Sequence, residues 1–386
     1  VDPRRDHSFR IPSPRLTQHI GTPNACSGCH DDKPASWSAA AIDRWYGAKS
    51  IAEDEAALIF AAARQGEPQA LTGLTRLAGD AGAPAILAAT ALEHLRAWFP
   101  AHPALAATLA ALGSSAPLVR ATAAGSLEQI PMKYRRQAAA PLLEDPVRAV
   151  RIEAARVLAG MPALLFGERQ AAFERALQEY KELQLSLADT PEAHLNLGVM
   201  YTDQQLLQQA EQAYREALRL APEFLPARVN LANLDNRMGR NHEAEEQFRE
   251  ALELAPEMGE LYYSFGLLLG EEQRYTEAAA LLQQAVDLLP GRPRVGYNHA
   301  LVLLQLQRYA DAETALRQAL TLSPEDADIL YAMVSLHVQQ QQWQQAQPFA
   351  ARLVEATRGA AGPAKILADI ERQLDASNGD KSTAEK

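Results

Sequence analysis

The chain has 386 residues, 47% of them hydrophobic and 22% charged, and its 48 acidic residues outnumber its 37 basic ones. This length suggests roughly two or three domains, and no apolar run approaches the ~18 residues of a membrane span. The net charge of −11 argues against a nucleic-acid partner, because phosphate backbones attract clustered cations. Two cysteines are too few for a disulfide scaffold. We therefore expect a soluble protein without a membrane span.

Both cysteines lie in one short motif near the N-terminus, Cys26-Ser27-Gly28-Cys29-His30. A Cys-x-x-Cys-His run is the attachment pattern of a c-type haem. Cys26 and Cys29 would form thioether bonds to the porphyrin, and His30 would ligate the iron. The motif predicts one covalent haem c.

Other chemistries compete for this cysteine pair. A zinc site usually has four ligands, and the chain has no second Cys-x-x-Cys or His-x3-5-His cluster. A thioredoxin-like dithiol opens a helix after a strand, and the flanking residues 21–24 and 31–32 lack that pattern. An inert surface pair is the last alternative. The haem interpretation is favoured over these three.

The second axial ligand of the iron has several candidates, namely His7, His19 and the six methionines. Asp6 stands beside His7 and would orient its imidazole. A helix is expected after the motif, with Trp37 and Trp45 on one face. That face either lines the porphyrin or packs against the next domain.

From Pro191 onward the sequence repeats at a fixed interval. The recurring residues are Ala210, Ala244, Ala278, Ala312 and Ala346, with Pro222, Pro256, Pro290 and Pro324. The pattern resembles the tetratricopeptide repeat (TPR) family, whose period is about 34 residues. In that family small residues let two helices approach closely and a proline ends the second helix, so the resemblance implies stacked helical hairpins. The fifth copy drifts, and we expect Pro348 to interrupt its second helix.

Residues 51–162 are rich in alanine and leucine and repeat with a slightly shorter period. Val119-Arg120 and Val150-Arg151 occupy equivalent positions in two copies. Such pairs resemble HEAT-type repeats, in which valine and arginine open the second helix. No strand-like alternation of polarity persists, so the expected fold class is all-α.

These patterns divide the chain into four expected parts. They are a loop-rich c-type haem-binding segment (1–50), HEAT-like repeats (51–162), a TPR array with a capping helix (163–375) and a disordered tail (376–386). The repeats together predict an α-solenoid preceded by the haem-binding segment.

The TPR resemblance implies a groove lined by the first helix of each hairpin. Tyr263, Tyr297 and Tyr331 occupy one groove position in successive repeats, and tyrosine is favoured in protein interfaces. The alternative is that these rings pack against the neighbouring helix. Asn230 and Asn233 are the polar candidates for contacts with a bound peptide. We expect a peptide or protein partner in this groove.

The order of features resembles the C-terminal portion of multihaem c-type cytochromes that end in helical repeats. The resemblance rests on residues 6–12 (Asp-His-Ser-Phe-Arg-Ile-Pro), residues 21–30 and Trp37. It implies that His7 is an axial ligand, of this haem or of another, and that the partner is a redox protein or another multihaem subunit. Haem attachment of this kind happens outside the bacterial cytoplasm, so it also implies a periplasmic protein whose leader has been removed.

No nucleophile elbow, phosphate loop or His-Glu-x-x-His motif is present. We therefore interpret the chain as an electron carrier, or a subunit of a multihaem oxidoreductase, rather than as an enzyme by itself. The alternative is a non-redox TPR scaffold whose Cys-x-x-Cys-His motif is vestigial or binds a metal.

Overall fold

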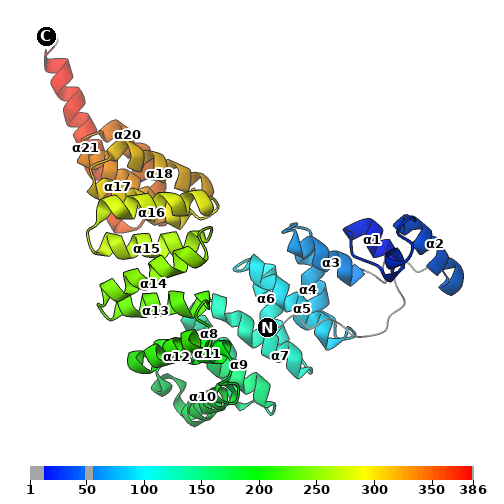
Figure 1. Cartoon of the computed structure of the whole chain (residues 1–386). Helices are drawn as coiled ribbons and strands as arrows, with labels where there is room; N and C mark the ends of the chain where they lie inside the picture. Colours follow the sequence, from blue (N-terminus) through cyan, green and yellow to red (C-terminus); the bar gives the residue numbers. More distant parts are fainter. Residues whose placement is uncertain (1–12, 48–54, 385–386) are drawn as a thin grey trace. The chain divides into compact units, whose positions relative to one another are not determined.

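Helices α1 to α21 and several short 3-10 helices form the computed structural model, which describes residues 13–47 and 55–384 (Figure 1). The described residues contain no strand, so the all-α prediction is confirmed. None of their helices is both long and apolar enough to cross a membrane. Internal contacts divide the chain into two units, 1–187 with 203–205 and 188–202 with 206–386.

The first unit begins with two helices joined by a loop that carries the cysteine motif. Helix α1 covers Pro14–Ile20, the 3-10 helix η1 covers Ala25–Gly28 and α2 covers Ala35–Tyr46. Arg15 of α1 contacts Asp43 of α2 at 2.6 Å. This ion pair ties the two helices together on either side of the loop.

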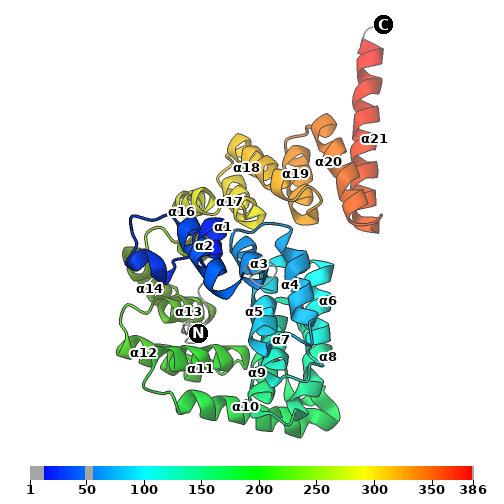
Figure 2. The ribbon, with the colours of Figure 1, turned by 90° about the vertical axis from the view of Figure 1, so that its right-hand side faces the viewer.

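The remainder of the first unit is a stack of short helices. They are α3 (Glu55–Arg64), α4 (Ala70–Gly79), α5 (Ala85–Leu95), α6 (His102–Ala111), α7 (Pro117–Ser126), α8 (Met132–Ala139), α9 (Arg148–Leu158) and α10 (Gln170–Leu185). Helices α5, α7, α9 and α10 pack in that order, each against the next (Figure 2). Buried alanines such as Ala91, Ala123 and Ala154 keep the helices close.

Two arginines at equivalent repeat positions make the same contacts and explain the repeated Val-Arg pattern. Arg120 donates to both carboxylate oxygens of Asp145, at 2.8 and 3.0 Å, and to the carbonyl of Ser114 at 2.7 Å. Arg151 binds Glu179 in the same way, at 2.7 and 3.0 Å, and the carbonyl of Asp145 at 2.8 Å. Each arginine thus fixes the turn before its own helix and reaches an acid of the next copy.

Glu179 belongs to α10, so this helix continues the stack of the first unit. Phe173 and Ala176 of α10 also share a core with Val150 and Ala154 of α9. The sequence pattern placed the boundary between residues 162 and 163, whereas the contacts place it after Leu187. The difference is α10, whose sequence spacing matches the later repeats while its buried face packs on α9.

The second unit is built from five helical hairpins in strict register, followed by a last helix (Figure 1). The first helices of the hairpins are α11 (Pro191–Asp203), α13 (Leu225–Arg237), α15 (Gly259–Glu271), α17 (Pro293–Gln305) and α19 (Ala327–Gln339). The second helices are α12 (Leu207–Leu220), α14 (Asn241–Leu254), α16 (Tyr275–Leu288), α18 (Tyr309–Leu322) and α20 (Trp343–Ala356). Corresponding helices begin at the constant interval that the sequence repeat predicts.

Close approach of the two helices in a hairpin requires a small residue opposite a large one. A Cβ atom added to Gly198 would overlap the ring of Tyr214, and one added to Gly266 would lie 2.8 Å from Leu282. Tyr214 and Leu282 are themselves almost completely buried. The same pair of positions therefore fixes the distance between the helices in both hairpins.

The turn between the two helices of each hairpin uses a left-handed residue. Its φ is between 57° and 75° at Gln205, Gly239, Gln273, Gln307 and Gln341. The residue after it donates its backbone amide to a carbonyl near the end of the first helix and so caps that helix. In the third hairpin, the Arg274 amide donates to the carbonyl of Leu269 at 2.9 Å. Four of these turns contain glutamine rather than glycine, so the packing of the hairpin holds a conformation that the side chain disfavours.

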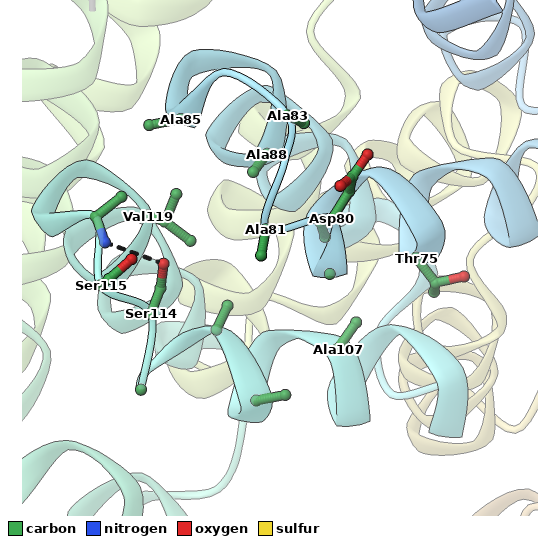
Figure 3. Close-up of a pocket in the computed structure, with 16 residues that line it drawn as sticks. Thr75, Asp80, Ala81, Ala83, Ala85, Ala88, Ala107, Ser114, Ser115 and Val119 are labelled. Carbon is green, nitrogen blue, oxygen red and sulfur yellow. Dashed lines mark hydrogen bonds between the residues drawn. The ribbon is translucent and has the colours of Figure 1, made fainter.

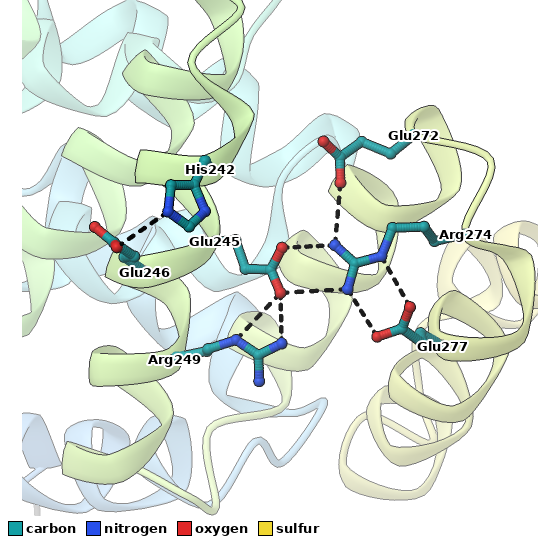
Figure 4. Close-up of polar contacts among 7 residues, drawn as sticks. All are labelled: His242, Glu245, Glu246, Arg249, Glu272, Arg274 and Glu277. Atoms are coloured by element: carbon teal, nitrogen blue, oxygen red, sulfur yellow. Dashed lines mark hydrogen bonds and ion pairs between the residues drawn. The ribbon is translucent and has the colours of Figure 1, made fainter.

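Ion pairs connect successive hairpins of the array. Arg240 binds Glu211 of the preceding hairpin at 2.9 Å, and Arg274, at the equivalent position, binds Glu245 at 2.6 Å. Figure 4 shows Arg274 held between Glu245 and Glu277. The hydrogen bond from Arg274 lowers the pKa of the Glu245 carboxyl below its ordinary value.

The end of the array differs from the sequence expectation at two places. Pro348 lies inside α20, which runs unbroken from Trp343 to Ala356, so the predicted interruption is wrong. Phe349 and Ala350 beside it are buried in the core, and their packing holds the helix despite the lost hydrogen bond. The last helix, α21, covers Ala361–Ala384 and so extends past residue 375 into the segment 376–386 that the sequence pattern predicts as a disordered tail.

The close contact at Gly198 gives a test of this packing. We expect Gly198→Ala to lower the free energy of unfolding by about 1–3 kcal/mol, because the new methyl group overlaps the Tyr214 ring. Gly270→Ala is the matched control, since its nearest neighbour would be 3.7 Å away. Urea denaturation of both variants is the measurement, and equal stability of the two would contradict the packing argument.

Candidate functional site

The cysteine motif folds into a single helical turn. Asn24 precedes the turn, and its side-chain oxygen accepts the amide N–H groups of Cys26 at 3.1 Å and Ser27 at 3.3 Å. The amides of Cys29 and His30 both donate to the carbonyl of Cys26, at 3.2 and 2.9 Å. Residues three and four positions apart on such a turn are neighbours. Local hydrogen bonding therefore brings the two thiols and the imidazole to one side of the loop.

Asn24 also ties this turn to the preceding helix. Its side-chain amide donates to the hydroxyl oxygen of Thr17 on α1 at 3.0 Å. Helix α1 is in turn held to α2 by the ion pair of Arg15 and Asp43. The motif is thus supported from outside by side chains that its own pattern does not include.

A cavity of about 270 Å³ lies between the turn and α2. Cys26, Cys29 and His30 line it from the turn, and Trp37 and Trp45 line it from α2, with four smaller or aliphatic neighbours. The ring centroids of His30 and Trp37 are 4.8 Å apart. The cavity therefore combines two free thiols, one imidazole and two indoles.

The tryptophans of α2 stay open to solvent, at 40% for Trp37 and 69% for Trp45. Ser38, Ala39 and Ile42 are the buried residues of this helix. The alternative that both indoles are buried against the next helical domain does not match the exposure of Trp45. Its ring instead borders the cavity beside the cysteines.

The cavity brings together the three side chains that a c-type haem motif uses, and they do not form a site for a bare metal ion. A haem of this type needs two thiols and one imidazole from the motif, and those three side chains line one cavity. A closed zinc site needs four ligands, and within residues 13–47 and 55–384 no group of three or more His, Cys, Asp or Glu side chains is arranged so that it could hold a metal ion. His7 lies outside the described residues, and His19 is exposed on α1.

Three histidines of the helical repeats are engaged in packing. His337 is 1% exposed, and its Nδ1 lies 2.8 Å from the side-chain oxygen of Gln342. Burial lowers the pKa of His299, and His94 stacks on Phe60 with ring centroids 5.4 Å apart. These contacts explain the three histidines without a ligand.

The three predicted groove tyrosines do not share one environment. The hydroxyl of Tyr263 accepts the side-chain amide of Asn298 at 2.7 Å, and the Arg294 guanidinium lies 4.7 Å from the ring centroid of Tyr297. Both rings pack against the core of the array. Tyr331 is 54% exposed. Contacts inside the array thus occupy two of the rings, and Tyr331 is the most accessible.

The two asparagines predicted for peptide contacts lie together on α13. Asn230 is half-buried and Asn233 is exposed, and within the described part of the chain neither side chain makes a hydrogen bond. Asn236, one turn further on, donates to Glu271 at 3.1 Å. Asn233 is therefore a free amide on the first-helix side of the hairpins.

Another cavity, of about 300 Å³, lies among α4, α5, α6 and α7 (Figure 3). Its wall is mostly alanine, and two of its polar side chains, Ser114 and Asp80, accept the backbone amides of Ala116 and Gly82, at 3.2 and 2.8 Å. Small side chains that leave space between short helices account for it. It lacks the convergent polar groups of a ligand site.

Comparison with family models supports the repeat assignment of the second unit. Models described as tetratricopeptide repeat match residues 191–224, 229–293, 269–319 and 303–370. The hairpins of the second unit are thus tetratricopeptide repeats. No curated protein matches the chain by sequence.

Several solved structures are similar to part of this chain. PilF of Pseudomonas aeruginosa has 23% identity and a TM-score of 0.41, with 51% of this chain and 97% of that chain covered. YrrB, described as a TPR protein with an unusual peptide-binding site, has 18% identity and a TM-score of 0.41, covering 48% and 93%. MamA of Desulfovibrio magneticus RS-1 has 16% identity and a TM-score of 0.40, covering 44% and 94%.

The Asn24 contacts give a test of how the motif is held. We expect Asn24→Ala to speed amide exchange at Cys26 and Ser27 by about five- to tenfold, because a net hydrogen bond contributes about 1 kcal/mol. Asn24→Asp keeps the accepting oxygen and loses only the donor to Thr17, so it should retain most of the protection. Hydrogen exchange measured by NMR distinguishes the two, and equal exchange in all three proteins would contradict this role.

Proposed function

We propose that this chain, whose residues 191–370 carry tetratricopeptide repeats, is a protein-interaction scaffold that bears one covalent haem c near its N-terminus and transfers electrons through it. The scaffold part rests on the repeat array and its first-helix surface. The haem part rests on one observation, the cavity that both thiols, the imidazole and the two indoles share. The non-redox scaffold is the alternative, and it needs only the repeat array.

In the haem-bearing form each residue of the motif has a defined task. Cys26 and Cys29 would hold the porphyrin by thioether bonds, and His30 would bind the iron from the same turn. The haem supplies a one-electron redox centre. Asn24 keeps the turn formed, and by resemblance to multihaem c-type cytochromes His7 would supply a second ligand to the iron.

The remaining assignments follow from that resemblance and are proposals in the same sense. Residues 51–162 are HEAT-like, which the repeated contacts of Arg120 and Arg151 support. The location is the periplasm, where c-type haem is attached in bacteria. The partner is a redox protein or another multihaem subunit, held by the array while electrons pass through the haem.

Covalent attachment is tested by expression with the cytochrome maturation machinery. We expect the wild-type chain to carry one haem by intact mass and by haem-stained gel, and Cys29→Ala to lose the attachment. Its helical circular dichroism should stay unchanged, because repeat stability is local. A control cytochrome is expressed in the same way. If the control receives haem and the wild-type chain does not, the redox function is ruled out and the non-redox scaffold remains as the function.

Peptide binding by the array is tested at its most exposed groove tyrosine. Peptides selected from a displayed library on the wild-type chain should bind Tyr331→Ala about tenfold more weakly, since an interface tyrosine contributes on the order of 1–2 kcal/mol. Tyr134→Ala is the matched control, because Tyr134 is 57% exposed on α8 of the first unit. Binding is measured by calorimetry. If Tyr331→Ala binds the peptides as tightly as the wild type, the peptides do not bind at Tyr331.

A further inference from the structure

Helix α2 presents a face with two tryptophans that the described residues leave exposed. Trp37, Ala41 and Trp45 follow each other at intervals of four residues and so lie on one side of the helix. All three line the cavity beside the cysteine turn. Contiguous exposed apolar patches mark ligand or partner sites, whereas single exposed apolar residues need no such explanation.

The residues around this face of α2 indicate what kind of group it binds. The opposite wall of the cavity consists of Cys26, Cys29 and His30. A group attached to these residues would therefore lie in direct contact with the indoles. Charged side chains are absent among the described residues that line the cavity. A flat, apolar and aromatic group suits such a wall, because ring systems stack on indole faces.

We propose that Trp37 and Trp45 form the inner wall of the haem site, so that a porphyrin attached at Cys26 and Cys29 covers both indoles. Trp37 also acts as a positioning residue, since its ring contacts the His30 ring at 4.8 Å between centroids and limits the directions that this imidazole takes. The inference rests on the proposed haem attachment and adds which surface of this chain receives the porphyrin.

The wall has a measurable consequence for the redox centre. Excluding water from one side of a haem disfavours the more highly charged oxidised iron, so burial raises the reduction potential. Removing an indole opens the site to water. The potential of the haem should therefore move to more negative values, and the circular dichroism of its main absorption band should change because an adjacent aromatic ring is lost.

The experiment uses the full chain with its haem attached. Trp37→Ala and Trp45→Ala are compared with Tyr46→Ala, which removes a comparably exposed ring next in sequence to Trp45 and outside the cavity lining. We expect a more negative midpoint potential and an altered Soret dichroism in the two tryptophan variants only. Trp37→Phe and Trp45→Phe should restore most of both signals.

The outcomes separate this inference from the haem proposal beneath it. If every variant carries haem with the reduction potential and dichroism of the wild type, the proposed tryptophan wall is wrong and the haem proposal stands. Absence of haem from the wild type would overturn both. The proposed wall is supported if Trp37→Ala or Trp45→Ala fails to attach haem while Tyr46→Ala and the phenylalanine variants attach it normally. If Tyr46→Ala also fails to attach haem, the cause is unfolding of α2, and the proposed wall is wrong.

Discussion

The distance between two packed helices is the constraint on which most of this structure depends. Where Gly198 faces Tyr214, and Gly266 faces Leu282, no side-chain atom fits between the helix backbone and the ring or branched chain opposite. That contact fixes the distance between the helices in these two hairpins, and all five hairpins stack with a constant period along the chain. Buried helix packing also holds Pro348 inside α20 and glutamines in left-handed turns. Both features run against local preference and survive because the neighbouring core residues outweigh them.

Charged side chains specify neighbours in both units. In the first unit, Arg120 and Arg151 each bind the turn before their own helix and an acid in the following copy. In the second unit, Arg240 and Arg274 reach back to an acid in the preceding hairpin. Such bidentate or branched contacts are directional, whereas alanine-rich helix faces are nearly alike. They therefore help to set the order and register in which short helices stack.

The haem proposal depends on two levels of structure. A local turn, capped by Asn24, gathers the cysteines and the histidine. A tertiary contact then places the indoles of α2 across a cavity from them. The first level offers covalent attachment, and the second offers an apolar surface of the kind that tunes a redox centre.

The sequence by itself determined the helical class and the period of the hairpins, and it supplied the Cys-x-x-Cys-His motif on which the haem proposal rests. All of these depend on residues close together or repeated at a fixed interval, so a linear pattern carries them. Only the tertiary structure decided that α10 packs with the first unit, that Tyr263 and Tyr297 are engaged while Tyr331 is exposed, and that Trp37 and Trp45 face the cysteines. Those outcomes depend on which helix faces pack against each other. Residues at the same position of successive repeats can therefore contact different neighbours.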